Sequence, residues 1–129
     1  YILKLATQLG YKIAIITGGR EQEIKIRLKK LGIHEVFLNC HNKLPVLVEF
    51  IKKYQLQQKN IMYMGDDIPD IEALKHVGFS CCPKNAVHDV KSICDYISDK
   101  NGGEGCVRDV IEQTLKVTNN WGLNGKIKY

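Results

Sequence analysis

An apolar run that ends in a cluster of acids constrains this chain more than any other feature. Ile61–Met64 has the composition of a buried strand, Gly65 closes it, and Asp66, Asp67 and Asp70 follow at once. In α/β proteins, side chains at the carboxyl end of a strand lie where ligands bind. Clustered carboxylates repel unless a cation lies among them, and oxygen ligands suit a hard ion such as Mg²⁺. The segment therefore predicts a metal-assisted site for a phosphorylated ligand.

Short apolar runs alternate with helical patterns along the chain. Strands are predicted over residues 12–17, 35–38, 60–64, 79–82 and 96–97, and helices over 2–9, 21–31, 44–54, 68–76, 87–92 and 105–117. This alternation with short connections implies a parallel sheet of right-handed crossovers, a Rossmann-like three-layer α/β/α architecture. The β-branched run over 12–17 predicts a strand covered on both faces. We expect one domain over residues 1–118 and a flexible tail over 119–129, in which the role of Trp121 stays open.

Four polar segments follow predicted strands: Thr17–Arg20, Asn39–Lys43, Asp66–Asp70 and Pro83–Asn85. Parallel strands end at one edge of their sheet, so these segments are expected to converge. The Thr17 hydroxyl and the amides of Gly18 and Gly19 are suited to bind phosphate oxygens at the start of a helix. Lys43 is suited to neutralise phosphate charge.

Each of these residues also has a purely structural interpretation. Thr17 and the two glycines after it are also typical of a strand-to-helix turn with threonine as the cap. A single lysine in a loop, such as Lys43, is commonly just solvated. Asp67 and Asp70 can cap the helix that starts near Ile68, because acids favour the first helical turn.

The composition excludes several classes of protein. No stretch is apolar enough to span a membrane. The net charge of +5 is spread over helical segments with no basic stripe, so nucleic-acid binding is not predicted. The five cysteines are an odd count, and adjacent Cys81 and Cys82 suit no ordinary disulfide. These two sit in an apolar context, where free cysteine acts as a small apolar side chain, and we expect a reduced cytoplasmic protein. The chain begins with Tyr1 inside a helical pattern, so we expect it to start within a longer protein.

The motifs occur in an order that is known from one superfamily. Ile-Ile-Thr-Gly, Asn-Lys and Gly-Asp-Asp-x-x-Asp resemble motifs two, three and four of the haloacid dehalogenase superfamily of phosphohydrolases. Within it, the chain resembles phosphatases of eight-carbon acidic sugar phosphates over nearly its whole length. That closer resemblance rests on five segments: Leu31–Ile33, Asn42–Leu44, Tyr63–Asp70, Cys81–Pro83 and Asn101–Val110.

The resemblance implies a Mg²⁺-dependent phosphatase of lipopolysaccharide precursor synthesis, with a phospho-aspartyl intermediate and a homotetrameric assembly. Thr17 and Lys43 match the catalytic hydroxyl and lysine of motifs two and three. Asp66 matches the metal ligand of motif four, with Asp67 and Asp70 as supporting acids. Positions matched to substrate binding are Thr17, Gly18, Gly19, Arg20, Arg27, Lys43 and Arg108.

Two departures from the family pattern bear on activity. Gly19 stands where many relatives carry arginine, and Arg20 comes one position later. The Asp-x-Asp of motif one, which holds the nucleophile and the general acid–base, occurs nowhere in the 129 residues. In the family this motif lies on a central first strand, and a sheet without it has unpaired edges. We therefore expect the carboxy-terminal part of a longer enzyme, inactive on its own.

Two alternatives to the eight-carbon substrate stay open. The same family serves sialic-acid-type sugars, so a phosphatase for a nine-carbon 9-phosphate is one of them. The other is a non-catalytic, phosphatase-like module that assembles a sugar-nucleotide synthetase. An Asp-x-Asp-Gly just ahead of Tyr1 would favour the enzyme, whereas a nucleotidyltransferase domain there would favour the module.

Overall fold

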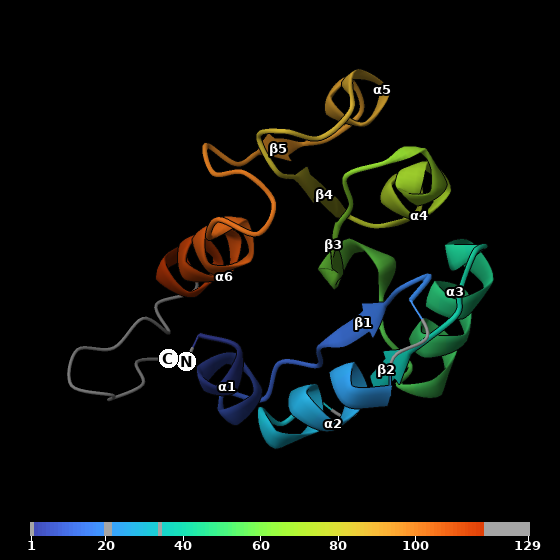
Figure 1. Cartoon of the computed structure of the whole chain (residues 1–129), viewed down its shortest axis with the longest axis vertical. Coiled ribbons are helices and arrows are strands. Elements are labelled where there is room, and N and C mark those ends of the chain that lie inside the picture. The colour runs from blue at the N-terminus through green and yellow to red at the C-terminus, as the bar shows by residue number, and fades with distance from the viewer. Residues whose placement is uncertain (1, 20–21, 34, 118–129) are drawn as a thin grey trace. The chain divides into compact units, whose positions relative to one another are not determined.

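Strands pair only in parallel within the computed structural model, which describes residues 2–19, 22–33 and 35–117. The described parts of 1–39 and 107–129 form one compact unit, and Cys40–Cys106 forms the other. Each unit carries its own sheet (Figure 1). The predicted parallel α/β class is therefore confirmed. The domain bounds 1–118 stay a prediction, and the predicted tail with Trp121 lies outside the described residues.

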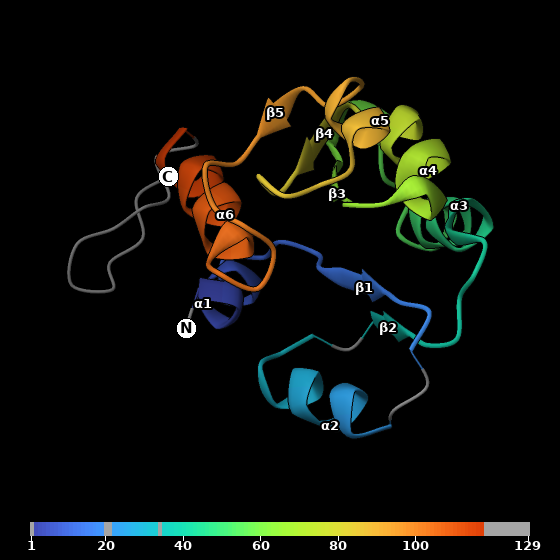
Figure 2. The ribbon, with the colours of Figure 1, turned by 45° about the horizontal axis from the view of Figure 1, so that its top comes forward.

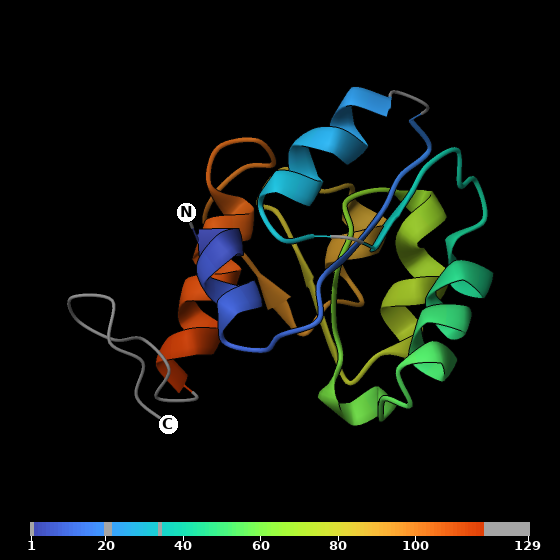
Figure 3. The same cartoon turned by 90° about the horizontal axis from the view of Figure 1, so that it is seen from below.

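The first unit combines a two-stranded sheet with three helices. Its elements are α1 (Ile2–Gln8), β1 (Ala14–Ile16), α2 (Gln22–Lys30), β2 (Glu35–Phe37) and nearly all of α6 (Cys106–Val117). In the sheet, Ala14 lies opposite Glu35 and Ile16 lies opposite Phe37. Figures 1, 2 and 3 agree in placing α1 beside α6.

Glycines end both α1 and α2, as the sequence predicts. Gly10 and Gly32 have φ angles of +91° and +88°, in the left-handed region that favours glycine. The Ile33 amide then donates back to the Leu28 carbonyl at 3.0 Å, and the residue after Gly10 makes the same kind of bond. Such bonds satisfy carbonyls that a helix end leaves without partners, and they turn the chain toward the next strand.

β1 differs from its prediction in length and burial. The strand covers Ala14–Ile16 rather than residues 12–17, and all three of its residues are only half-buried. The expectation of a strand covered on both faces is therefore wrong for β1. The reason is its place in the sheet, because among the described strands β1 pairs with β2 alone.

The second unit has a three-stranded sheet and carries most of the polar candidates. Its elements are α3 (Lys43–Lys53), η1 (Gln58–Asn60), β3 (Met62–Met64), η2 (Ile68–Asp70), α4 (Ile71–His76), β4 (Phe79–Cys82), α5 (His88–Lys91) and β5 (Tyr96–Ile97). The strand order is β3-β4-β5, with Met64 opposite Cys81 and Cys82 opposite Ile97. Figures 2 and 3 show α3 and α4 running side by side.

An apolar cluster of α4, β4 and α5 forms the core of this unit. Its buried members are Leu74, Cys82, Ala86 and Val90, and Tyr63 packs against them from β3. Cys81 and Cys82 are fully buried, and all five cysteines are free thiols. Burial raises the pKa of Cys81 to about 12, so this thiol stays protonated. For Cys81 and Cys82, the prediction of small apolar side chains is confirmed.

The five described strands form two separate sheets rather than one. β1-β2 and β3-β4-β5 share no hydrogen-bonded pair among the described residues. The missing central strand itself stays a prediction.

We predict that Gly78→Ala destabilises the second unit. A Cβ atom at Gly78 would lie 2.5 Å from the backbone Cα and carbonyl oxygen of Lys59, and backbone cannot move aside as a side chain tip can. The free energy of unfolding should fall by about 1–3 kcal/mol, measured by urea denaturation. Gly102→Ala is the control, because its Cβ meets nothing closer than Asn85 Oδ1 at 3.5 Å. Equal stability of the two variants would contradict this prediction.

Candidate active site

Gly65 lets the chain fold back at the end of β3. Its amide donates to the Cys81 carbonyl at 3.2 Å, which extends the pairing with β4 by one residue. A Cβ atom at this position would lie 2.4 Å from Cβ of Asp70. Because no side chain fits there, glycine allows the Asp70 carboxylate to lie directly beneath the strand end.

Asp70 is the centre of the hydrogen-bond network in the second unit. Its side chain is buried, and Oδ1 accepts from Lys43 Nζ and from the Tyr63 hydroxyl, both at 2.9 Å. Oδ2 accepts from the amides of Asp66 at 3.1 Å and Asp67 at 3.3 Å. A carboxylate offers about four lone-pair positions. Protein donors therefore already satisfy the Asp70 carboxylate.

Asp70 is held in its ionised form. Burial by itself raises the pKa of this carboxyl group, but hydrogen bonds from Lys43, the Asp66 amide and Tyr63 outweigh burial and lower the pKa below its ordinary value. The 2.9 Å ion pair with Lys43 acts in the same direction. A buried negative charge thus faces a positive one at the strand end.

Lys43 is the first residue of α3 and is not freely solvated. Its side chain is 18% exposed and pairs with Asp70, so the simple surface interpretation of this lysine is wrong. An ammonium group has three N–H donors, and Asp70 takes one of them. The others remain for an anionic ligand, as the functional interpretation requires.

The structural interpretation of Asp67 is confirmed. Its Oδ1 accepts from the Ile68 amide at 2.7 Å, and Asp67 and Asp70 together form a capping box on η2. Pro69 occupies the first turn, where its missing N–H costs nothing. The helix predicted over 68–76 consequently begins as the 3₁₀ turn η2 and continues as α4.

Of the three acids, Asp66 has a carboxylate that makes no cap or ion pair within the described part of the chain, while the exposed Asp67 uses Oδ1 as a cap. Asp66 is exposed, and its side chain accepts no hydrogen bond from the described residues. Its backbone is fixed, because the carbonyl accepts from the Val87 amide at 3.1 Å. Within the described residues no three His, Cys, Asp or Glu side chains form a group that could hold a metal ion. The three predicted acids therefore make different contacts in the structure. Metal ligation by Asp66, Asp67 and Asp70 stays a prediction.

Thr17 and its glycines form a turn in the first unit. Thr17 Oγ1 accepts from the Gly19 amide at 3.1 Å, as the turn interpretation predicts, and the Thr17 amide continues the ladder to Phe37 at 3.0 Å. Gly19 in turn accepts from the Asn39 amide at 2.7 Å. The hydroxyl proton of Thr17 can still be donated to a ligand. The phosphate contacts of Thr17, Gly18 and Gly19, and their convergence with the acids, stay predictions.

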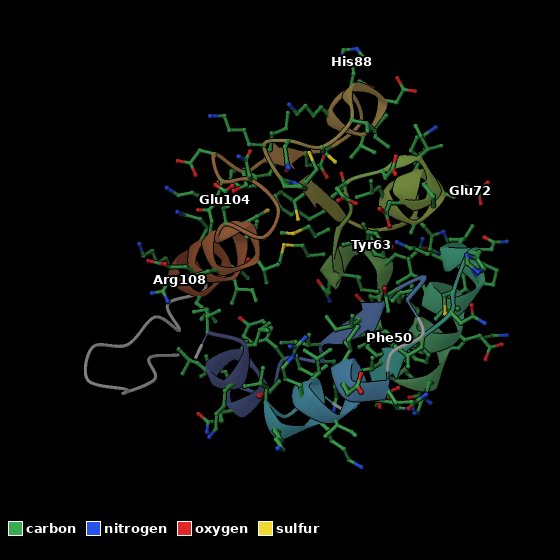
Figure 4. The ribbon with its side chains drawn as sticks, viewed as in Figure 1. Phe50, Tyr63, Glu72, His88, Glu104 and Arg108 are labelled. Atoms are coloured by element: carbon green, nitrogen blue, oxygen red, sulfur yellow. The ribbon has the colours of Figure 1, made fainter. Side chains whose placement is uncertain are left out.

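No contact within the described ranges joins the predicted substrate-binding arginines to one another. Arg27 is exposed on α2. Arg108 is exposed on α6, where it lies 3.6 Å from Glu112 (Figure 4). Arg20 lies outside the described residues. Their roles toward a substrate stay predictions.

Sequence reasoning missed Tyr63 as a member of the site. It lies in the middle of β3 (Figure 4) and donates to Asp70. The available signal was chemical, since Tyr63 carries the only hydroxyl in an otherwise apolar strand and a buried tyrosine hydroxyl usually finds a partner. That signal does not identify the partner, which lies seven residues further along the chain.

A parallel α/β fold with an ammonium group and carboxylates at a strand end defines an enzyme-like site for anionic ligands. The chain belongs to the haloacid dehalogenase-like hydrolases, because that family model matches residues 21–111. The family predicted from the motifs is thereby confirmed.

Two individual proteins show what this chain resembles within the family. The chain is 30% identical over 115 residues to a 3-deoxy-D-manno-octulosonate 8-phosphate phosphatase of Salmonella typhi, covering 89% of this chain and 61% of the relative. It is similar to the crystal structure of the Moraxella catarrhalis phosphatase of the same name, in complex with magnesium, phosphate and the sugar acid. There the TM-score is 0.89 and the identity 37%, over 92% of this chain and 68% of the other.

A third comparison supports the fold alone. The cobalt-bound phosphatase from Haemophilus influenzae has a TM-score of 0.88 at 24% identity, with 92% of this chain and 70% of the other covered. The sequence spans about three fifths of the length of its curated relatives. No described helix is long and apolar enough to cross a membrane.

We predict that Asp70→Asn destabilises the fold in a pH-dependent way. An amide nitrogen cannot accept the bonds now made to the carboxylate, so unfolding should become easier by about 2–4 kcal/mol at pH 7. Because folding lowers the pKa of Asp70, its contribution is complete above roughly pH 4 and is lost as the pH falls through the folded-state pKa. The difference from wild type should therefore shrink in acid.

Urea denaturation across pH measures this difference. Asp66→Asn is the matched control, because its exposed carboxylate supports no hydrogen bond among the described residues and its loss should leave stability nearly unchanged. A constant gap between Asp70→Asn and wild type from neutral to acid pH would show that ionised Asp70 does not stabilise the fold.

Proposed function

We propose that this chain is part of a Mg²⁺-dependent phosphatase that hydrolyses 3-deoxy-D-manno-octulosonate 8-phosphate to the free sugar acid and phosphate. The observation that carries the proposal is the strand-end arrangement in which Asp70 pairs with the Lys43 ammonium and accepts from the amide of Asp66, whose own carboxylate is exposed. The magnesium, phosphate and sugar acid in the Moraxella catarrhalis complex support the choice of ligands.

The residues present fit a magnesium ion. Mg²⁺ keeps several waters and uses one or two protein carboxylates together with substrate phosphate oxygens. Asp66 supplies one exposed carboxylate on a fixed backbone, which is a partial ligand set of this kind. When bound, the ion would neutralise charge on the phosphoryl oxygens.

Lys43 is proposed to bind the transferring phosphoryl group. Phosphoryl transfer needs mainly positioning and charge neutralisation. The ammonium of Lys43 is tied to Asp70, so little side-chain entropy is left to lose when a phosphate arrives. For Thr17 and the amides of its turn, the proposed role is to donate hydrogen bonds to phosphate oxygens.

The nucleophile is proposed to lie on sequence that precedes Tyr1, since these 129 residues hold no Asp-x-Asp. In the reaction that the family resemblance implies, the first aspartate attacks phosphorus as the ester P–O bond breaks. The second aspartate protonates the leaving sugar oxygen. Water, activated by that second group, then hydrolyses the phospho-aspartate. A homotetrameric assembly and a cytoplasmic location belong to the same proposal.

The substrate is tested with the full-length protein, meaning this sequence together with its natural upstream residues. We expect phosphate release from 3-deoxy-D-manno-octulosonate 8-phosphate to exceed that from a sialic-acid-type 9-phosphate by at least about tenfold in kcat/KM. EDTA should stop the release and added Mg²⁺ should restore it. Faster turnover of the nine-carbon ester would reassign the substrate, and no release from any ester would refute the phosphatase.

The roles of Asp66 and Lys43 are tested in the same assay. Asp66→Asn should lower Mg²⁺-dependent kcat by roughly 100-fold or more, and Lys43→Ala should lower kcat by roughly 100-fold. Glu49→Gln and Lys52→Ala remove the same charges from exposed positions further along α3 and should leave kcat unchanged. If Lys43→Ala raised KM alone, Lys43 would serve only to bind substrate.

A further inference from the structure

Tyr63 is tied to the site by its hydroxyl and to the core by its ring. The hydroxyl donates to Asp70 Oδ1 at 2.9 Å, while the ring packs against the apolar cluster of Leu74, Cys82 and Val90. Burial, followed by the nearby Asp70 charge, raises the pKa of Tyr63 far above its ordinary value. The hydroxyl thus keeps its proton and remains a donor at every physiological pH.

Tyr63 and Lys43 share a single oxygen of Asp70. Both donors lie 2.9 Å from Oδ1, whereas Oδ2 is occupied by the backbone amides that follow β3. An oxygen of this kind accepts about two hydrogen bonds. The rigid tyrosine therefore takes one lone pair and leaves the other as the single place for the flexible lysine.

This arrangement links the lysine to the backbone of Asp66. The Asp70 carboxylate joins Lys43 on one oxygen to the Asp66 amide on the other. Rotation of the carboxylate about its χ2 angle would move the ammonium group relative to that backbone. The two backbone amides hold Oδ2, and the Tyr63 hydroxyl, carried on a strand of the sheet, holds Oδ1 against the rotation.

We infer that Tyr63 is a positioning residue, whose hydroxyl orients the Asp70 carboxylate and thereby places the Lys43 ammonium for phosphoryl transfer. This inference rests on the proposed phosphatase function. It assigns Tyr63 a role in that function, with Asp70 connecting Tyr63 to Lys43. Tyr63 touches neither substrate nor metal in this scheme and acts through Lys43 alone.

The test is a double-mutant cycle of Tyr63→Phe and Lys43→Ala in the full-length protein. Phenylalanine keeps the ring and the core packing and removes only the hydroxyl. We expect Tyr63→Phe to lower kcat about tenfold with KM little changed, and to have almost no effect when Lys43 is already alanine. Tyr96→Phe removes a hydroxyl from β5 of the same sheet and should leave kcat unchanged.

The outcomes separate this inference from the proposed function. If the wild-type enzyme is active but the losses from the two substitutions multiply, Tyr63 acts independently of Lys43 and the inference is overturned while the function stands. If wild type releases no phosphate from any ester, the function is refuted, and the inference with it. Circular dichroism melting completes the test, because a Tyr63→Phe protein that does not fold would make the hydroxyl structural and overturn the inference.

Discussion

The buried carboxylate of Asp70 is the interaction on which the rest of the site depends. Without this carboxylate, the ammonium of Lys43 would lose its ion pair and the amides after β3 would lose their acceptor. Burial alone disfavours a charged carboxylate, so Asp70 is tolerated only because four donors converge on it. Gly65 leaves the space that this convergence needs, because any side chain there would displace Asp70.

One short sequence motif thus performs three physical tasks. Asp66 leaves an exposed carboxylate at the strand end, Asp67 caps η2, and Asp70 organises the surrounding donors. These identical side chains have different roles because they differ in solvent exposure and in the hydrogen-bond donors around them. In this haloacid dehalogenase-like hydrolase, the Asp70 carboxylate thus connects a candidate metal ligand at the end of β3 with a lysine at the start of α3.

Much of the fold could be predicted from local patterns. Phe79–Cys82 and Tyr96–Ile97 were predicted to the residue, and Gly10 and Gly32 were predicted as helix ends. These features depend on short apolar runs and on backbone angles, which act within a few residues of each other. The burial of β1 was predicted wrongly, because it depends on which strands lie on either side.

The sequence by itself determined the parallel α/β class, the family, and the candidacy of Lys43 and the three acids. Each of these follows from local periodicity and from the order of motifs along the chain. Only the tertiary structure decided how the acids divide their tasks and that Tyr63 joins them. Those outcomes depend on which donors reach a particular carboxylate oxygen, and contacts between β3, α3 and the turn after β3 are made in space rather than along the chain.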